Sequence, residues 1–223
     1  MRKFFEELIR IALFGVILFL LWRVIHLPAS PVIDYCLLLG GILLVFPVVW
    51  AGRMLLNRLP AASLTAWIVT IVHYLLMTLF GAAILRAIAS YPDWPGPILP
   101  IPVEIGLALV LLTGAGLLLT VINLALKGLG APFAIALSRK LASDWMYAWT
   151  RNPMALCLLA FLLALGIWYR SVLFVLWILF LVAPAWLAFL KVFEERELEI
   201  RFGASYLEYR SRTPMLFPRK PKK

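Results

Sequence analysis

Two short charged stretches contain the residues whose types and spacing could support chemistry in this chain. The first begins at Arg151 and Asn152, and the second begins at the adjacent carboxylates Glu194 and Glu195. Taken alone, the arginine is typical of a basic residue at a membrane interface, and the glutamates are typical of a solvated helix face. Two adjacent carboxylates that directly follow an apolar segment and face a basic motif favour a site that binds a charged ligand.

The elements between these stretches must bring them together. Residues 153–168 and 172–193 are apolar and are separated only by residues 169–171. Such a short link predicts an antiparallel helical hairpin, which begins and ends on the same side of a membrane. We expect Pro153 to occupy the first turn of the first helix and Asn152 to cap it. The two charged stretches should therefore meet at one surface.

The composition indicates an all-α, polytopic membrane protein. Of the 223 residues, 64% are hydrophobic and 14% are charged, and the mean hydropathy is +0.99. A water-soluble domain could not bury so much apolar surface. Residues 1–223 read as a single integral-membrane domain, in which residues 1–126 provide four spans and residues 127–223 provide a connector, the hairpin and a tail.

About six transmembrane helices are expected, followed by a C-terminal amphipathic helix. The hairpin gives the last two spans, and the four expected before it are residues 8–26, 31–51, 63–90 and 103–126. The first segment has no small-residue cleavage site, so it is expected to remain as a span. Residues 52–62 are expected to form a link, and the proline-rich residues 91–102 cannot be helical.

The distribution of basic residues predicts the orientation. With six spans and both termini in the cytoplasm, only Arg23, Arg86 and Arg170 of the 21 lysines and arginines lie outside. This orientation also places both charged stretches, and therefore the site that they would form, on the cytoplasmic side of the membrane. The basic tail is expected to contact anionic lipid. Nucleic acid is not an expected partner, because the chain has no recognisable nucleic-acid-binding motif.

The cysteines and histidines give no reason to expect a metal site. Cys36 and Cys157 both fall inside apolar segments, and the chain has only His26 and His73 besides. These residues form neither a disulfide framework nor a metal-ligand cluster. His73 lies inside the third span, where an ionisable group commonly faces a cavity. The alternative is a neutral histidine that bonds to a neighbouring helix.

The residues after the glutamates follow a longer pattern. Their spacing is Glu194-Glu195-x-x-Leu198-x-x-x-Phe202-Gly203-x-x-Tyr206-x-x-Tyr209, followed by Pro214 and Pro218. It resembles the C-terminal signature of the integral-membrane methyltransferases that include isoprenylcysteine carboxyl methyltransferase and phospholipid N-methyltransferase. The motif Arg151-Asn152-Pro153-Met154 is similar to the one that opens the hairpin in that family. Gly128 and Gly130 fall where the phospholipid enzymes carry a Gly-x-Gly, so the resemblance covers residues 127–218.

The resemblance implies S-adenosylmethionine-dependent methyl transfer to a lipophilic acceptor, with membrane lipid as the partner. It implies that Arg151 and Asn152 are catalytic. The implied cofactor-binding residues are Gly128, Gly130, Arg151, Pro153, Glu194, Glu195, Tyr206 and Tyr209. A carboxylate such as Glu195 can hold the ammonium or ribose hydroxyls of this cofactor, and Arg151 can pair with its carboxylate. Tyr206 and Tyr209 fit equally well as anchors of the tail helix at the interface.

The motif favours an amine-bearing phospholipid as the acceptor, because Arg-Asn-Pro-Met resembles the phospholipid branch more than the prenyl-cysteine branch. Asn152 stands where the isoprenylcysteine enzymes typically have histidine. Trp145-Met146-Tyr147 stands where family members often have Gly-Pro-Tyr, and Ala155 replaces a frequent tyrosine. A prenyl-cysteine carboxyl group and a small hydrophobic thiol are the alternative acceptors.

Two other functions remain as alternatives. One is an NADPH-dependent membrane reductase of the steroid-reductase type, whose C-terminal tail this one partly resembles; the hairpin motif and the paired glutamates argue against it. The other is a non-enzymatic membrane scaffold with a basic lipid-binding tail. The sequence does not indicate an oligomeric state.

Overall fold

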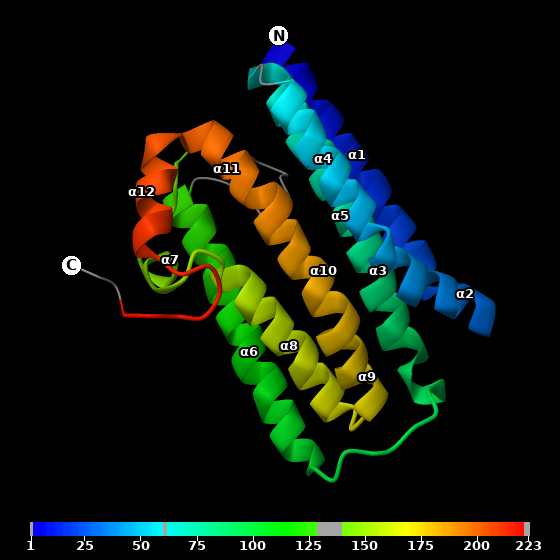
Figure 1. The fold of residues 1–223 in the computed structure, drawn as a ribbon. Helices are drawn as coiled ribbons and strands as arrows, with labels where there is room; N and C mark the ends of the chain where they lie inside the picture. Colours follow the sequence, from blue (N-terminus) through cyan, green and yellow to red (C-terminus); the bar gives the residue numbers. More distant parts are fainter. Residues whose placement is uncertain (1, 60–61, 129–139, 221–223) are drawn as a thin grey trace.

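The computed structural model describes residues 2–59, 62–128 and 140–220 (Figure 1). These residues are predominantly helical, and the described part of the chain contains no β-strand beyond an isolated bridge between Ile98 and Ser171. This confirms the all-α fold class. The candidate spans that are long and apolar enough to cross a membrane are Phe5–Ile25, Pro31–Arg58, Leu64–Asp93, Val103–Leu126 and Val172–Phe202.

The N-terminal part contains three long helical stretches. The first is α1 (Arg2–Ile25), and the third is α5 (Ala62–Ser90). The second comprises α2 (Pro31–Tyr35), a π-helical turn at Cys36–Gly40, α3 (Gly41–Leu43) and α4 (Val45–Arg58).

The expected link at residues 52–62 is wrong over most of its length, because α4 continues to Arg58 and α5 begins at Ala62. Gly52 lies inside α4, where the absence of a side chain allows neighbouring helices to pack closely. A Cβ atom at this position would lie 2.8 Å from side-chain atoms of both Val72 and Phe193. A glycine at a helix contact and a glycine in a turn look alike in sequence.

The C-terminal part begins with a 3₁₀ turn at Tyr91–Asp93 and an extended connection. Its helices are α6 (Val103–Asn123) with the π-helical turn Leu124–Gly128, α7 (Met146–Trp149), α8 (Pro153–Trp168), α9 (Val172–Trp177), α10 (Ala183–Ala188), α11 (Glu195–Phe202) and α12 (Ala204–Arg212). π-helical turns at Ile178–Val182 and Phe189–Glu194 join α9, α10 and α11 into one long helix.

Helix α8 is the apolar segment that falls short of a full span. It has 16 residues, which gives a length of about 24 Å, less than the roughly 30 Å hydrocarbon core of a bilayer. It packs antiparallel to α6 at small residues: a Cβ atom on Gly106 would lie 2.5 Å from the Trp168 backbone. Close contact of this kind is typical of helix pairs inside membranes.

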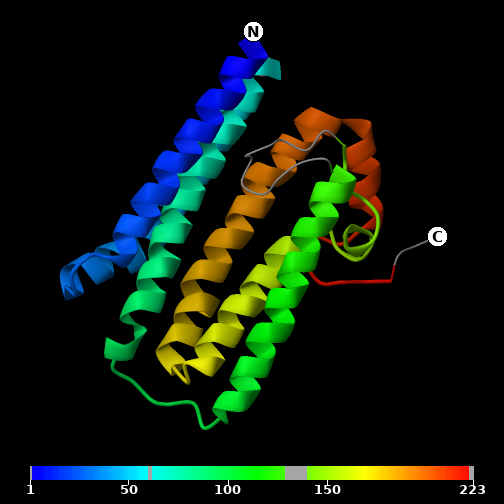
Figure 2. The ribbon, with the colours of Figure 1, turned by 180° about the vertical axis from the view of Figure 1, so that it is seen from behind.

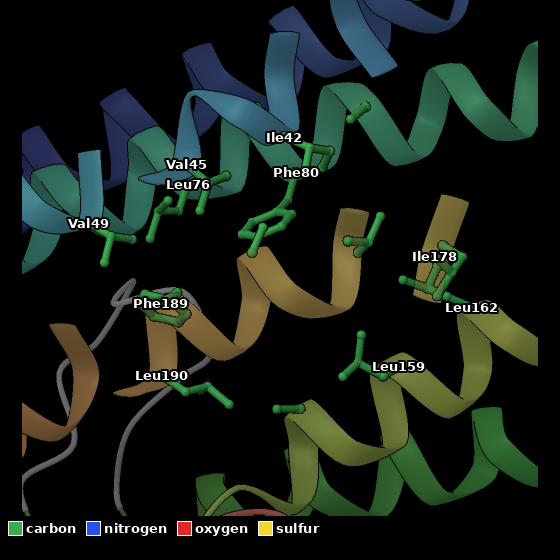
Figure 3. Packing of buried hydrophobic residues seen from close by; sticks show 14 of the residues in the cluster. Ile42, Val45, Val49, Leu76, Phe80, Leu159, Leu162, Ile178, Phe189 and Leu190 are labelled. Carbon is green, nitrogen blue, oxygen red and sulfur yellow. The ribbon is translucent and has the colours of Figure 1, made fainter. Parts of the chain in front are cut away.

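The helices form two sides of one bundle. Helices α1, α4 and α5 lie together on one side, and α6, α8 and the long α9 to α11 helix lie on the other (Figures 1 and 2). Buried apolar side chains join the sides, as Figure 3 shows for Val49 of α4, Leu76 of α5, Leu162 of α8 and Phe189 of the long helix. Van der Waals packing is the main attraction between helices when lipid surrounds them.

Polar contacts also tie α4 to the long helix. The Nη1 atom of Arg53 donates to the Val192 carbonyl oxygen at 2.8 Å, and Arg196 Nε donates to Asn57 Oδ1 at 2.8 Å. Both contacts lie close in sequence to the adjacent glutamates. The N-terminal helices therefore help to position the charged end of the hairpin.

Candidate functional site

The hairpin places Arg151 and Glu195 in contact. Arg151 immediately precedes the capping residue of α8, Glu195 begins α11, and Arg151 Nη2 lies 2.5 Å from Glu195 Oε1. Both side chains are largely buried, with 9% and 15% of their surfaces exposed. Arg151 Nη1 also donates to the Arg210 carbonyl oxygen at 3.3 Å. A short, shielded contact between these charges forms the polar centre of the candidate site.

Helix α12 adds a second arginine that the sequence analysis missed. Arg210 Nη1 lies 3.9 Å from Glu195 Oε2 and pairs with Glu199. The chain turns back onto α11 at Gly203, whose φ of 52° and ψ of −129° favour glycine. In the sequence, the glycine between two charged segments could have predicted this reversal.

The segment after α12 holds the start of α8 in place. The backbone N–H of Arg151 donates to the Pro214 carbonyl oxygen at 2.9 Å. The carbonyl oxygen of Met215 accepts from Asn152 Nδ2 at 2.9 Å and from Thr150 Oγ1 at 3.1 Å. The two sequence motifs are thus joined directly through backbone and side-chain hydrogen bonds.

The expected side-chain cap by Asn152 is wrong. Asn152 occupies the capping position of α8, but its side chain makes no capping hydrogen bond. Its amide nitrogen instead donates to Met215. The segment that accepts this bond is more than sixty residues away in the sequence, so capping preferences, which are local, could not predict it.

Three tyrosines lie near the charged residues of the site. The Tyr209 hydroxyl donates to the Tyr147 carbonyl oxygen at 2.7 Å, and Tyr206 is buried beside Tyr209. Burial raises the pKa of all three phenols, and the Glu195 carboxylate raises the pKa of Tyr206 further. The hydroxyls therefore stay protonated near neutral pH and can donate hydrogen bonds.

A cavity of about 510 Å³ connects this polar centre to the interior of the bundle. Its polar end is lined by Lys140, Tyr147, Arg151, Asn152, Glu194, Glu195, Glu197, Arg201, Tyr206 and Tyr209. Its other walls are apolar and come from both sides of the bundle, and they include Phe14, Leu18, Phe80, Ile84, Trp186 and Leu190. The cavity thus has a charged end beside a hydrophobic one, which suits a polar ligand and an apolar ligand held next to each other.

Most of the residues expected at the site line this cavity, namely Arg151, Asn152, Glu194, Glu195, Tyr206 and Tyr209. Pro153 is buried at the first position of α8 and does not line the cavity. Gly128 ends the π-helical turn that follows α6, and Gly130 lies outside the described residues. The structure therefore brings the charged residues and tyrosines together and does not place the glycine motif.

The polar end has unused binding capacity. Arg151 Nε is buried and has no hydrogen-bond partner among the residues that the structure describes. A ligand that carries a carboxylate beside an ammonium could bind the guanidinium and Glu195 together. Within the described ranges, no group of three or more histidine, cysteine, aspartate or glutamate side chains is arranged to hold a metal ion.

The comparisons with known proteins agree with the resemblance described above. Residues 101–205 match the model of the phospholipid methyltransferase family, and this confirms the similarity to integral-membrane methyltransferases. The matched region runs from just before α6 into α12 and includes Arg151, Glu195 and the hairpin between them. No curated protein and no solved structure gives a significant match to the chain.

Proposed function

We propose that this membrane protein, which resembles the phospholipid methyltransferases over residues 101–205, transfers a methyl group from S-adenosylmethionine to a lipophilic acceptor. The observation that carries the proposal is the buried contact between Arg151 and Glu195 at the polar end of a largely apolar cavity. The charged end suits a small polar cofactor, and the apolar walls suit a lipid.

The residues at the polar end fit S-adenosylmethionine. Arg151, with its unpartnered Nε, can bind the cofactor carboxylate, and Glu195 can bind its ammonium or a ribose hydroxyl. Tyr206 and Asn152 line the same end of the cavity and can donate further hydrogen bonds. The cofactor, when bound, supplies a methyl group on a positively charged sulfur that a lone pair can attack. The protein contributes by holding donor and acceptor side by side and by excluding water.

An amine-bearing phospholipid is the acceptor that we favour. The family match and the Arg-Asn-Pro-Met motif both support this choice. The cavity is lined by Leu18 of α1 and Ile84 of α5 as well as by hairpin residues, so acyl chains can lie between the two sides of the bundle. We further propose that both termini and the site face the cytoplasm, as the distribution of basic residues predicts.

The test is incubation of membranes that contain the protein with methyl-labelled S-adenosylmethionine, followed by separation of lipid, protein and volatile fractions. We expect label in amine phospholipid with the wild type and severe loss with Glu195→Gln and Arg151→Ala. Glu208→Gln is the matched control, because Glu208 is 68% exposed and pairs with Arg212 away from the cavity. It should keep wild-type activity.

Each other outcome selects a different function. Label in the protein or volatile fraction keeps the methyltransferase class and replaces the acceptor by a prenyl-cysteine or a small thiol. Protection of the purified protein by NADPH, without transfer of label, supports the reductase. Failure to bind either cofactor, with a silent Glu195→Gln change, supports a scaffold and rejects the proposal.

A further inference from the structure

His73 of α5 lies in the wall of the cavity with one ring nitrogen free. Its Nδ1 atom is 2.9 Å from the Val69 carbonyl oxygen. A carbonyl oxygen can only accept, so Nδ1 carries a proton, and Nε2 has a lone pair whenever the ring is neutral. Among the described residues, Nε2 has no hydrogen-bond partner, while His73 lines the cavity.

The aromatic contacts locate His73 along the cavity. Its ring centroid lies 5.4 Å from that of Phe189 and 5.9 Å from that of Phe193, the residue just before Glu194. Two turns further along α5, the ring centroid of Phe80 lies 4.7 Å from that of Trp186. Trp186 lies further along the long helix from the glutamates than Phe189 and Phe193 do. His73 is therefore the cavity-lining residue of α5 nearest to the charged end.

The cavity wall changes from polar to apolar at His73. The next cavity-lining residues of α5 are Leu76, Met77, Phe80 and Gly81, none of which is ionisable. Figure 3 shows Leu76 and Phe80 on the side of α5 that faces Phe189 and Leu190. A lipid bound with its tails along these residues would have its headgroup close to His73.

All but one of the other ionisable groups of the cavity are less suited to accept a proton from that headgroup. The charged residues that line the cavity are Lys140, Arg151, Glu194, Glu195, Glu197 and Arg201. Glu195 and Glu197 are each 2.5 Å from an arginine nitrogen. The raised pKa values of the tyrosines keep their hydroxyls protonated near neutral pH, so the phenolates that could act as bases are not formed. Glu194 is the remaining competitor, and it lies within the carboxylate pair assigned to the cofactor.

We propose that His73 is the general base that deprotonates the ammonium group of the acceptor lipid. The inference rests on the proposed methyl transfer. An ammonium has no lone pair and cannot attack a methyl group, so it must first lose a proton. The residue lies outside the region that matches the methyltransferase family, so that match does not assign this role.

The proposed step is balanced. His73 Nε2 takes one proton from the ammonium, and the freed amine lone pair forms a carbon–nitrogen bond with the methyl carbon. The carbon–sulfur bond of the donor breaks and its electron pair stays on sulfur, which leaves as a neutral thioether. The imidazolium then releases its proton to water. Imidazole is suited to this exchange near neutral pH.

The first test is the rate of methyl transfer to phosphatidylethanolamine in His73→Asn, in which the amide nitrogen can still donate to Val69. We expect the rate at pH 7 to fall by about 100-fold or more, with cofactor affinity unchanged by calorimetry. The defect should shrink as pH approaches the ordinary pKa of an alkylamine, about 10, because the acceptor then loses its proton without help. His26→Gln, at the other histidine, should behave as wild type.

The second test needs no turnover. Protein labelled with ¹⁵N-histidine in the His26→Gln background is placed in nanodiscs and observed by NMR. The unprotonated Nε2 resonance should shift with phosphatidylethanolamine and not with phosphatidylcholine, whose trimethylated headgroup has no proton to give.

The outcomes separate this inference from the proposed function. A wild type that methylates no acceptor rejects both. An active wild type with an unaffected His73→Asn variant, or with identical spectra in the two lipids, rejects the role of His73 alone. A pH defect that appears in Glu194→Gln instead would assign the base to Glu194.

Discussion

Single residues at the polar centre serve as contacts of the fold and as possible contacts of a ligand. Arg151 binds a side-chain carboxylate and the Arg210 carbonyl oxygen, and its backbone is bonded to Pro214. Losing the whole side chain would leave Glu195 buried without its strongest partner. Glu195→Gln preserves size and hydrogen bonding, so it is the sharper probe of cofactor binding.

Tyr206 allows a test of burial through pH. Burial and the Glu195 carboxylate raise the pKa of its phenol above the ordinary value, about 10 for tyrosine. The unfolded chain therefore loses this proton at a lower pH than the folded protein does, so stability falls as pH rises above about 10. Tyr206→Phe should show a shallower fall in thermal stability between about pH 9 and about pH 11. Equal slopes for variant and wild type, measured in detergent, would contradict the burial described here.

The sequence could predict the charged half of the site and not its supporting contacts. The short link between two apolar segments was sufficient to bring Arg151 and Glu195 to one end. The link does not predict the positions of Arg210 and Met215. These residues reach the site only because Gly203 reverses the chain. Whether these residues bind a cofactor stays a prediction.

At the level of elements, the junction between α11 and α12 depends on Gly203. Its backbone angles strain any residue that has a Cβ atom, although there is space for one. Gly203→Ala should therefore cost roughly 1 to 3 kcal/mol and weaken cofactor binding, because α12 carries Tyr206 and Arg210. Gly15→Ala in α1, where a Cβ atom also meets nothing within 4 Å, is the control that should fold normally. Thermal unfolding and calorimetry measure the two effects.

The opposite end of the bundle is held by a buried arginine. Arg86 of α5 is 3% exposed, pairs with Asp34, and donates to the carbonyl oxygens of Leu27 at 2.9 Å and Pro28 at 3.0 Å. The sequence does not predict this pair, because Asp34 and Arg86 are 52 residues apart in the chain and meet only when the helices pack.

Removing one partner of this pair should destabilise the protein more than removing both. Arg86→Leu leaves the partly shielded Asp34 carboxylate, whose side chain is 20% exposed, without its counter-charge and should cost about 3 kcal/mol. The double change Arg86→Leu with Asp34→Leu should recover part of that loss, since no charge is then left unpaired. Unfolding midpoints of the purified variants provide the comparison, and strictly additive effects would argue against the pairing.

The elements themselves were largely predictable, because each apolar segment is long and is bounded by clear signals. The expected span at residues 63–90 matches α5 to within one residue, and the expected helix at residues 153–168 matches α8. The predicted bounds were wrong where a residue type that is common in turns serves helix packing instead, as Gly52 does. Tertiary contacts are not visible in hydropathy.

On the scale of the whole molecule, the orientation in the membrane is the outstanding prediction. Ser205 is exposed on α12, and Asp93 is exposed in the 3₁₀ turn that follows α5, at the opposite end of the bundle. With Cys36 and Cys157 changed to alanine, Ser205→Cys should react with an impermeant thiol reagent only from the cytoplasmic side. Asp93→Cys should react only from the opposite side. The reverse pattern would invert the proposed topology.

The bonds between the start of α8 and the segment after α12 have a consequence for how the protein is made. A ribosome completes Arg151 about sixty residues before it completes Pro214 and Met215, the residues that fix the arginine backbone and its neighbour Asn152. A nascent chain can therefore insert all its apolar helices into the bilayer while its site is still unformed. Truncation before Pro214 should yield a protein that enters the membrane and has no working site, so the segment after α12 completes the site only after the apolar helices have been made.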